Sequence, residues 1–535
     1  MLRSGSSFWV IALISAFIVF LNLGGIPLLD PDEPVYAETP KEMFQFNEFI
    51  SPRIYGEYWY DKPPMYYWLV AGAYKLFGIN EFAARFPSAL LAVICVLIVY
   101  KSGRRLFNNS AGMASALVLA TSIEYFYLGK AAVTDITLTL FLTLSLLSFI
   151  EKRYYLFYIF AGLATVTKGP IGLLFPGAIV FVYLAATRNF TELKNMKIVS
   201  GLILYSIVAV PWYWIMYQLH GGVFFDTFLG FHNITRFTSP EHPEGVLWYY
   251  YIPVLILGFF PWTALMVQAV WNSLRNSRQD FSVLVFLNIW AAFIFIFFTI
   301  SRTKLVSYIL PMYPPLAMIV GWYIDRILLG VHSQSSETTA RESGETKAAV
   351  SNESVVSRRF SWSAVLLILS ALFAGGMLKG LEFMPALQDG VFISAGIIMA
   401  MALAVGYLIW KNEVIKAFWV QIGSMVLFAA VLVTMLFPKI ADDFASKDIA
   451  REFTLNYDGK SPVYVTKFLR PGFAFYSDTY GIELKSDDDL GKVVATGFRA
   501  YFVIRKSEYE HLGEKEQQNL TILAEKADKI LLLKK

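Results

Sequence analysis

The chain has 535 residues, of which 56% are hydrophobic, 16% aromatic and only 16% charged. Because soluble globular proteins carry roughly 25% charged residues, this composition excludes a water-soluble protein and indicates that a bilayer surrounds much of the chain. The net charge of +4 comes from cations scattered between the apolar runs, so nucleic acid is not an expected partner. The single cysteine, Cys95, lies inside an apolar run, so a disulfide framework is not expected.

About thirteen runs are apolar and long enough to cross the hydrocarbon layer as helices, which takes about 20 residues each. They lie near residues 7–23, 84–100, 111–128, 132–150, 154–167, 171–187, 198–217, 249–270, 281–300, 305–328, 361–380, 391–410 and 414–437. No small-residue cleavage site follows the first run, so we interpret it as an uncleaved helix and not as a signal peptide. The sequence therefore predicts a polytopic α-helical membrane domain over residues 1–438.

The loops between these runs differ in charge, and the difference predicts their sides of the membrane. Lys and Arg gather in alternate short loops, which the positive-inside rule places in the cytoplasm together with the N-terminus. The loops at 24–83 and 218–248, and the chain after residue 438, then face outward. The polar stretch at 331–360 is predicted to be a flexible cytoplasmic loop.

The last part of the chain, residues 439–535, is polar enough to form a small soluble domain. Strand-like runs at 463–466, 500–504, 521–523 and 530–533 alternate with helical runs at 487–495 and 507–512. This alternation is typical of an α/β domain. We therefore expect an extracytoplasmic α/β domain after the last span.

The first outer loop contains the sequence Asp30-Pro31-Asp32-Glu33-Pro34-Val35-Tyr36 ahead of a helical run. Asp32 is predicted either to cap this helix, where carboxylates are stabilised by the helix dipole, or to act as a general base at the membrane surface. The two roles are compatible, because a cap holds a carboxylate rigidly. Glu33 and Tyr36 lie beside it and are additional candidates.

Farther along the same loop, an Asp61-Lys62 pair precedes two prolines and is surrounded by tyrosines and tryptophans. Aromatic residues are common at the headgroup level of any membrane protein. The Lys62 ammonium is predicted to contact a phosphate, either that of a substrate or that of surrounding lipid headgroups.

Four ionisable residues lie at the ends of spans on the predicted outer face: Asp135, Lys168, Arg302 and Lys304. Such residues are costly in a membrane and are therefore functional candidates. Snorkelling of the cations and helix capping by Asp135 are the alternatives. Cations on the outer face oppose the positive-inside bias, which favours a bound anion.

The second outer loop holds His220, His232 and His242, together with Arg236. The histidines are candidate metal ligands, but their spacing is irregular, and ordinary polar loop residues are the favoured interpretation. Arg236 is a candidate phosphate ligand, because a guanidinium binds phosphate through two parallel hydrogen bonds.

Several motifs, in chain order, resemble those of the aminoarabinose transferase family, integral membrane glycosyltransferases of the GT-C fold related to the protein O-mannosyltransferases. They are Asp-Glu-x-x-Tyr-Ala-Glu at 32–38, Asp-Lys-Pro-Pro at 61–64, Asn-Glu-Phe-Ala-Ala-Arg-Phe-Pro-Ser-Ala at 80–89, Thr-Asp at 134–135, Thr-Lys-Gly-Pro at 167–170, Ser-Arg-Thr-Lys at 301–304 and Tyr-Ile-Leu-Pro at 308–311. The family's layout, with thirteen spans and a periplasmic α/β domain, agrees with the pattern of apolar runs.

The resemblance implies a polyprenyl-phosphate sugar as donor and transfer at the outer face of a bacterial inner membrane. It implies Asp32 as general base, Asp135 as a supporting acid, and Lys62, Arg236 and Tyr308 as contacts to the donor phosphate. The family has Glu where this chain has Asp61. Some members also carry a structural zinc near the second outer loop, onto which these histidines do not map cleanly, so a zinc or other divalent metal stays open.

With a lipid phosphate as leaving group, the reaction needs cations and one base, and direct displacement inverts the anomeric carbon. The sequence leaves open a pentose or a hexose as sugar, and a lipid A-type glycolipid, another glycan, a lipid or a protein as acceptor. A polytopic transporter or flippase of lipid-linked sugars is the alternative function. Transporters usually show repeats and broken helices at mid-membrane, whereas the charges here gather at one face, which favours an enzyme.

Overall fold

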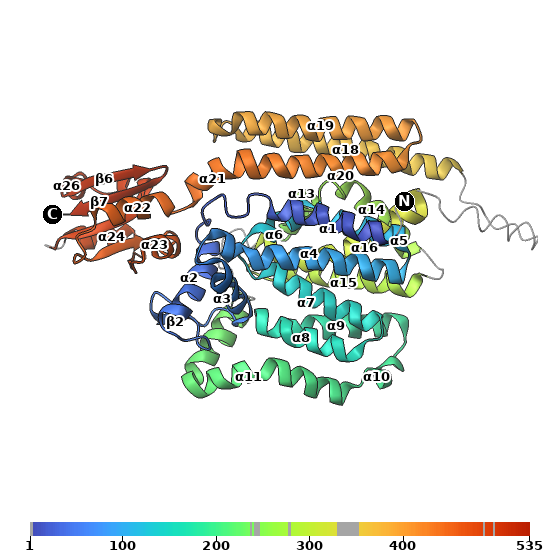
Figure 1. The fold of residues 1–535 in the computed structure, drawn as a ribbon, viewed down its shortest axis with the longest axis horizontal. Helices are drawn as coiled ribbons and strands as arrows, with labels where there is room; N and C mark the ends of the chain where they lie inside the picture. The colour runs from blue at the N-terminus through green and yellow to red at the C-terminus, as the bar shows by residue number, and fades with distance from the viewer. Residues whose placement is uncertain are drawn as a thin grey trace, which may run out of the picture.

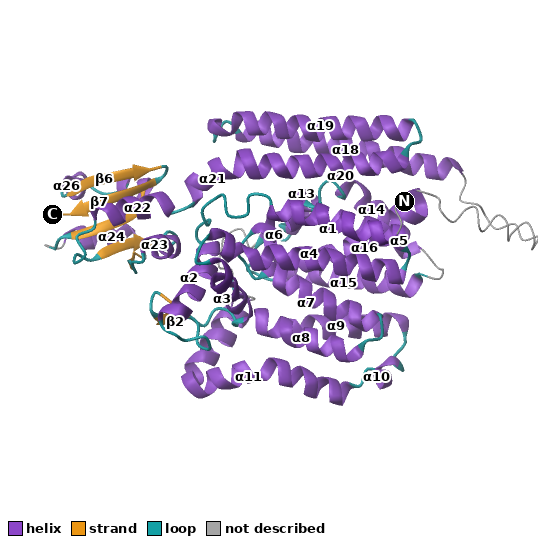
Figure 2. Cartoon of the chain, in the orientation of Figure 1, coloured by secondary structure: helices purple, strands orange, loops and turns teal. Residues whose placement is uncertain are grey.

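The structure is a computed structural model that describes residues 4–235, 238–239, 247–275, 280–328, 352–484, 487–495 and 498–534. A bundle of long helices makes up most of the molecule, and a small unit of helices and strands follows it at the C-terminus (Figure 1, Figure 2). The helices α2 (Asp32–Gln45) and α3 (Met65–Phe77) lie at the same end of the bundle as this C-terminal unit. We call this end of the molecule the α2 end.

The remaining helices of the bundle run roughly side by side and correspond to the apolar runs of the sequence (Figure 1). They are α1 (Ser4–Phe20), α4 (Glu81–Leu106), α5 (Asn109–Ala120), α6 (Ile123–Lys130), α7 (Asp135–Ile150), α8 (Tyr154–Lys168), α9 (Ile171–Thr187), α10 (Glu192–Asn195), α11 (Ile198–Phe225), α13 (Tyr251–Gly258), α14 (Thr263–Arg275), α15 (Phe281–Ile300), α16 (Tyr313–Tyr323), α18 (Asn352–Gly380), α19 (Gln388–Trp410) and α20 (Val414–Val431). Short helices η1 (Asp226–Thr235), η3 (Val306–Met312), η4 (Ile324–Leu328), η5 (Pro385–Leu387) and η6 (Leu432–Leu436) extend or connect them, and α21 (Phe437–Phe444) leads to the C-terminal unit.

Every predicted apolar run contains a helix, but not every run is one continuous helix. Six of the described helices are long and apolar enough to cross a membrane, and up to eight spans result if each of two bent helix pairs counts as one. The pair α5 and α6 bends by 63°, and the pair α13 and α14 by 107°. Pro261, between α13 and α14, lacks the N–H that a continuous helix would need there. The total number of spans thus stays a prediction.

The helix α2 begins one residue earlier than a capping role for Asp32 requires. Pro31 occupies the N-cap position and makes no side-chain cap, and Asp32 is the first residue of the helix. Asp135 likewise begins α7, after Thr134 at the N-cap. Both carboxylates therefore lie at the positive end of a helix dipole, which stabilises a negative charge.

The C-terminal unit is a five-stranded mixed sheet with helices on both faces. Its strands are β3 (Val463–Thr466), β4 (Ile482–Leu484), β5 (Ala500–Arg505), β6 (Leu520–Lys526) and β7 (Lys529–Lys534), in the spatial order β4-β3-β5-β7-β6. β3 pairs in parallel with β4 and β5, whereas β7 pairs antiparallel with β5 and β6. The helices are α22 (Lys447–Asn456), α23 (Arg470–Ser477), α24 (Asp487–Ala495), α25 (Lys506–Glu510) and α26 (Glu514–Gln518).

The C-terminal unit binds the bundle through polar contacts around the start of α2. The Asp30 carboxylate accepts a hydrogen bond from the Ser446 hydroxyl, and the Asp30 N–H donates to the Phe444 carbonyl oxygen at 2.8 Å. Lys447 forms an ion pair with Glu81 at 2.6 Å. Lys41 of α2 is buried and donates to the Phe475 carbonyl oxygen at the end of α23, at 3.0 Å. These contacts fix α2 between the bundle and the C-terminal unit.

Candidate active site

Asp32 is the centre of the candidate site because its carboxylate is accessible and its charge is not neutralised by a direct partner. Its side chain is exposed and forms no hydrogen bond or ion pair with the residues that the structure describes. Enough protein surrounds it that desolvation raises the pKa of Asp32 above its usual value, and the charges of Asp135 and Glu33 raise it further. Lys62 opposes this rise. A carboxylate with a raised pKa is a stronger base than an ordinary aspartate.

Asp135 lies near Asp32 but is held by a different helix. Its carboxylate is buried and accepts a hydrogen bond from the Lys168 ammonium at 2.6 Å. The same ammonium lies over the ring of Tyr308, 4.9 Å from its centre. Lys168, the last residue of α8, thus contacts both the first residue of α7 and a residue of η3. Three of the predicted site residues lie together here.

Lys62 and Asp61 form an ion pair of 2.8 Å in which both side chains are largely buried. Asp61 and Lys62 both act electrostatically on Asp32. Tyr36 lies nearby on α2, packed edge-on against Tyr66 with ring centres 5.6 Å apart, and burial together with the charge of Asp61 raises its pKa. Tyr36 therefore remains a neutral phenol that could donate a hydrogen bond within the cluster.

Arg302 and Lys304 lie in the segment between α15 and η3. The Arg302 side chain is exposed, whereas Lys304 is buried and donates to the Ser301 carbonyl oxygen at 2.7 Å. Desolvation and the charge of Arg302 lower the pKa of Lys304. Arg302 is thus the more accessible cation of this segment.

Glu33 points away from Asp32 and fixes the start of α2. One carboxylate oxygen accepts from Arg85 Nη2 at 2.6 Å and from the Leu29 N–H at 2.9 Å, and the other accepts from Arg85 Nε and the Ala132 N–H, both at 2.8 Å. Arg85 is buried in α4 and was not singled out by its chemistry in the sequence, although a lone arginine at the head of an apolar run is a signal of such a role. In this structure Glu33 positions α2.

The histidine and arginine candidates of the second loop fall largely outside the described residues. The side chains of His232, Arg236 and His242 are among those not described. His220 shares a hydrogen bond of 2.8 Å with the Ser51 hydroxyl and packs edge-on against Tyr58, with ring centres 4.4 Å apart. In the described part of the chain, no three His, Cys, Asp or Glu side chains are grouped closely enough to hold a metal ion.

Comparison with known sequences relates the chain to lipid-linked sugar transferases. The model of the dolichyl-phosphate-mannose-protein mannosyltransferase family matches residues 61–214. An uncharacterized protein of Aquifex aeolicus is 32% identical over 59% of this chain and 64% of its own length. An undecaprenyl phosphate-alpha-4-amino-4-deoxy-L-arabinose arabinosyl transferase of Aeromonas hydrophila is 30% identical over 58% of this chain. That match spans 59% of the relative's length.

Comparison with solved structures shows that the fold of nearly the whole chain is similar to those of two known proteins. ArnT from Cupriavidus metallidurans, solved with bound undecaprenyl phosphate, superposes with a TM-score of 0.79, and 98% of this chain and 97% of that chain are covered at 21% identity. The archaeal oligosaccharyltransferase AglB from Archaeoglobus fulgidus superposes with a TM-score of 0.54 over 94% of this chain and 69% of its own, at 13% identity. The arrangement of bundle, α2 end and C-terminal unit is therefore a fold shared with these proteins.

Proposed function

We propose that the chain is an aminoarabinose transferase-like membrane glycosyltransferase of the GT-C fold, and that it transfers a sugar from a polyprenyl-phosphate donor to an acceptor at the α2 end. The matched family model, the arabinosyl transferase relative and the shared fold support this proposal. The chain is an integral membrane protein, and the proposed location is the outer face of a bacterial inner membrane. The N-terminus is then cytoplasmic and the C-terminal unit periplasmic. The distribution of Lys and Arg between alternate loops supports this orientation.

The observation that carries the proposal is the exposed Asp32 carboxylate, which has no hydrogen-bond or ion-pair partner among the described residues and lies beside a cluster of fixed charges. In the proposed step, the acceptor oxygen attacks the anomeric carbon while its proton passes to Asp32. The bond between this carbon and the phosphate oxygen breaks, and the polyprenyl phosphate leaves as an anion. Lys62, Tyr308 and Arg236 are the proposed contacts of this leaving group. The displacement inverts the anomeric carbon.

The remaining residues of the cluster have supporting roles in this proposal. Lys168 holds Asp135 in place through a direct ion pair, so that a fixed negative charge keeps the pKa of Asp32 raised. Asp61 holds Lys62, which orients the ammonium for a phosphate. The proposal therefore requires one mobile proton, accepted by Asp32, and no general acid.

The test is transfer of labelled sugar from a polyprenyl-phosphate donor to membrane acceptors by purified full-length protein. Asp32→Asn keeps the size of the side chain but cannot accept the proton, and it should lower the rate by about 10²- to 10⁴-fold while donor binding persists. Glu57→Gln is the matched control, because Glu57 is an exposed carboxylate outside the cluster. Full transfer by Asp32→Asn would contradict the proposal, and movement of intact donor across vesicles without transfer would favour a transporter.

A further inference from the structure

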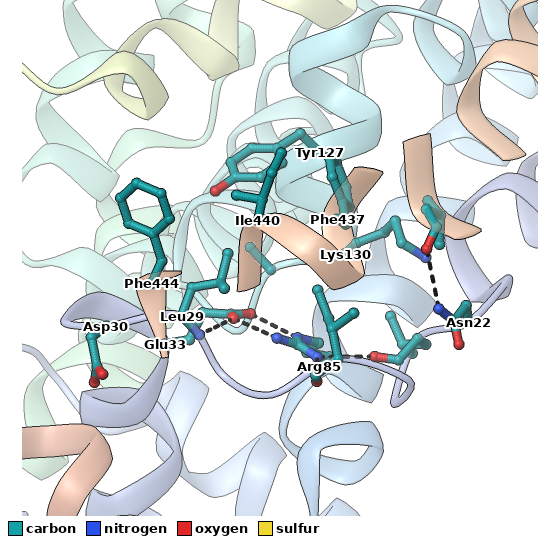
Figure 3. A pocket seen from close by; sticks show the side chains of 14 residues that line it. Asn22, Leu29, Asp30, Glu33, Arg85, Tyr127, Lys130, Phe437, Ile440 and Phe444 are labelled. Atoms are coloured by element: carbon teal, nitrogen blue, oxygen red, sulfur yellow. Dashed lines mark hydrogen bonds and ion pairs between the residues drawn. The ribbon is translucent and has the colours of Figure 1, made fainter. Parts of the chain in front are cut away.

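A cavity of about 360 Å³ lies beside the first turn of α2, where Glu33 and Arg85 form part of its wall. It is enclosed by the loop after α1, by α4 and α6, and by the segment from η6 to α21 that leads to the C-terminal unit. Figure 3 shows Tyr127, Phe437, Ile440 and Phe444 around it, with Lys130 at one side. The candidate active-site residues Lys62, Asp135 and Tyr308 do not line this cavity.

The walls of the cavity are mostly apolar, and its open side is suited to a membrane component. Phe437 and Ile440 cover it from α21, and Val433 from η6. Tyr127 and Phe444 are 44% and 53% exposed, so the cavity is bordered by apolar side chains that face the surroundings. It lies near the ends of α1 and α6, against the last part of the apolar helix Val414–Phe444. An acyl chain can therefore enter it directly from a bilayer.

Of the cations that line the cavity, one has no acidic partner among the described residues. Arg85 is neutralised by Glu33 at 2.6 Å. Lys130 is buried, and its ammonium donates to the carbonyl oxygens of Val19 at 2.9 Å and Leu21 at 2.5 Å, with no carboxylate partner in the described part of the chain. An ammonium has three donors, so one is left for a ligand. A buried ammonium without a counter-ion favours the binding of an anion.

Asp30 is the other anion of the cavity wall, and it is held by the C-terminal unit. Its carboxylate accepts from the Ser446 hydroxyl and is influenced by the charge of Lys529. In Figure 3 it lies at the opposite side of the cavity from Lys130. The positive charge of Lys130 is therefore not balanced by Asp30 and can be balanced by a bound anion.

We propose that this cavity binds one anionic membrane phospholipid, with its phosphate on Lys130 and an acyl chain against Phe437 and Ile440. The lipid then fills the space between the bundle and the segment that carries the C-terminal unit, and it stabilises the contact between them. This site is separate from the proposed transfer reaction. Basic pockets between membrane helices are suited to lipid phosphates in general.

The test compares binding of dioleoyl phosphatidylglycerol and dioleoyl phosphatidylcholine to the purified full-length protein in detergent. Native mass spectrometry counts the retained lipids, and thermal unfolding measures their effect. We expect one phosphatidylglycerol to be retained and to raise the Tm. Ile440→Trp, which fills the cavity, should abolish retention, and Lys130→Gln should reduce the preference for phosphatidylglycerol about tenfold. Each variant is first checked for monodisperse folding.

Matched controls carry the same changes outside the cavity. Leu427→Trp adds the same side chain on the exposed side of α20, and Lys379→Gln removes a cation that is exposed and paired with Glu382. Both should bind like the wild type, as should Asp32→Asn, so a failure of the proposed transfer reaction leaves this result intact. Equal binding of the two lipids by the wild type, or undiminished retention by Ile440→Trp, would overturn the site. Glycosylation of the retained lipid on addition of donor would overturn its structural role.

Discussion

At the scale of single residues, the proposed base depends on a neighbouring carboxylate that never touches the substrate in our scheme. The charge of Asp135 raises the pKa of Asp32. Asp135→Asn removes this charge, so the pKa of Asp32 should fall and the acidic limb of the profile of kcat/KM against pH should move to lower pH. The rate of transfer, measured between pH 4 and 9, gives the midpoint of this limb. A midpoint that stays in place would show that another group controls it.

A second residue-scale prediction concerns Tyr308, whose hydroxyl is a proposed contact of the donor phosphate and whose ring lies under Lys168 at 4.9 Å. Tyr308→Phe keeps the ring and removes the hydroxyl, and it should raise the KM for donor about tenfold, the effect of losing one hydrogen bond to a charged group. Tyr308→Leu also removes the ring and should cost more. Equal kinetic constants for the wild type and Tyr308→Phe would remove the hydroxyl from the donor site.

At the scale of elements, α2 holds its position through a buried ion pair with α4. Arg85→Met leaves the Glu33 carboxylate buried without its cation, which should destabilise the protein by about 3 to 5 kcal/mol. Thermal unfolding in detergent measures this loss. The double variant Glu33→Gln with Arg85→Met should recover part of it, because the amide leaves no buried charge. Additive effects of the two changes would mean that the pair does not couple α2 to α4.

The elements also show what the sequence can predict. The apolar run at 281–300 coincides with α15, because polar residues bound it on both sides. The run at 111–128 instead breaks between α5 and α6, where Thr121 and Ser122 donate their hydroxyls to carbonyl oxygens one turn back and hydropathy gives no sign of a bend. In the C-terminal unit the four longer strands were predicted, whereas β4 has only three residues and no pattern of its own.

The site was predicted as a set of residue types, but its geometry was not. Spacing gives no measure of the distance between Asp32 and Asp135, which are on different helices, and only the family resemblance placed them together. Glu33 was an additional candidate beside Asp32, and nothing in the sequence indicated that it would be held in an ion pair. Their different roles follow from the helix, in which successive residues point about 100° apart, so that Glu33 meets Arg85 while Asp32 does not.

At the scale of the whole molecule, attachment of the C-terminal unit should depend on pH through Asp30. Burial raises the pKa of Asp30 to about 7, although the Ser446 hydroxyl and Lys529 oppose the rise. The folded protein therefore holds this proton more tightly than the unfolded chain, whose aspartates have a pKa of about 3.9. The stability contributed by Asp30 is full below about pH 4 and is lost as the pH rises towards 7.

Asp30→Asn should remove this dependence, because an amide accepts the Ser446 hydrogen bond without carrying a charge. Relative to the wild type, the variant should be more stable at pH 8, by up to roughly 4 kcal/mol, and the difference should shrink as the pH falls to 5. Thermal unfolding and limited proteolysis near α21, compared at the two pH values, measure the effect. Asp443→Asn, an exposed change on the same segment, controls for loss of charge alone. An Asp30→Asn protein that is less stable than the wild type at pH 8 would mean that the charged form of Asp30 holds the C-terminal unit in place.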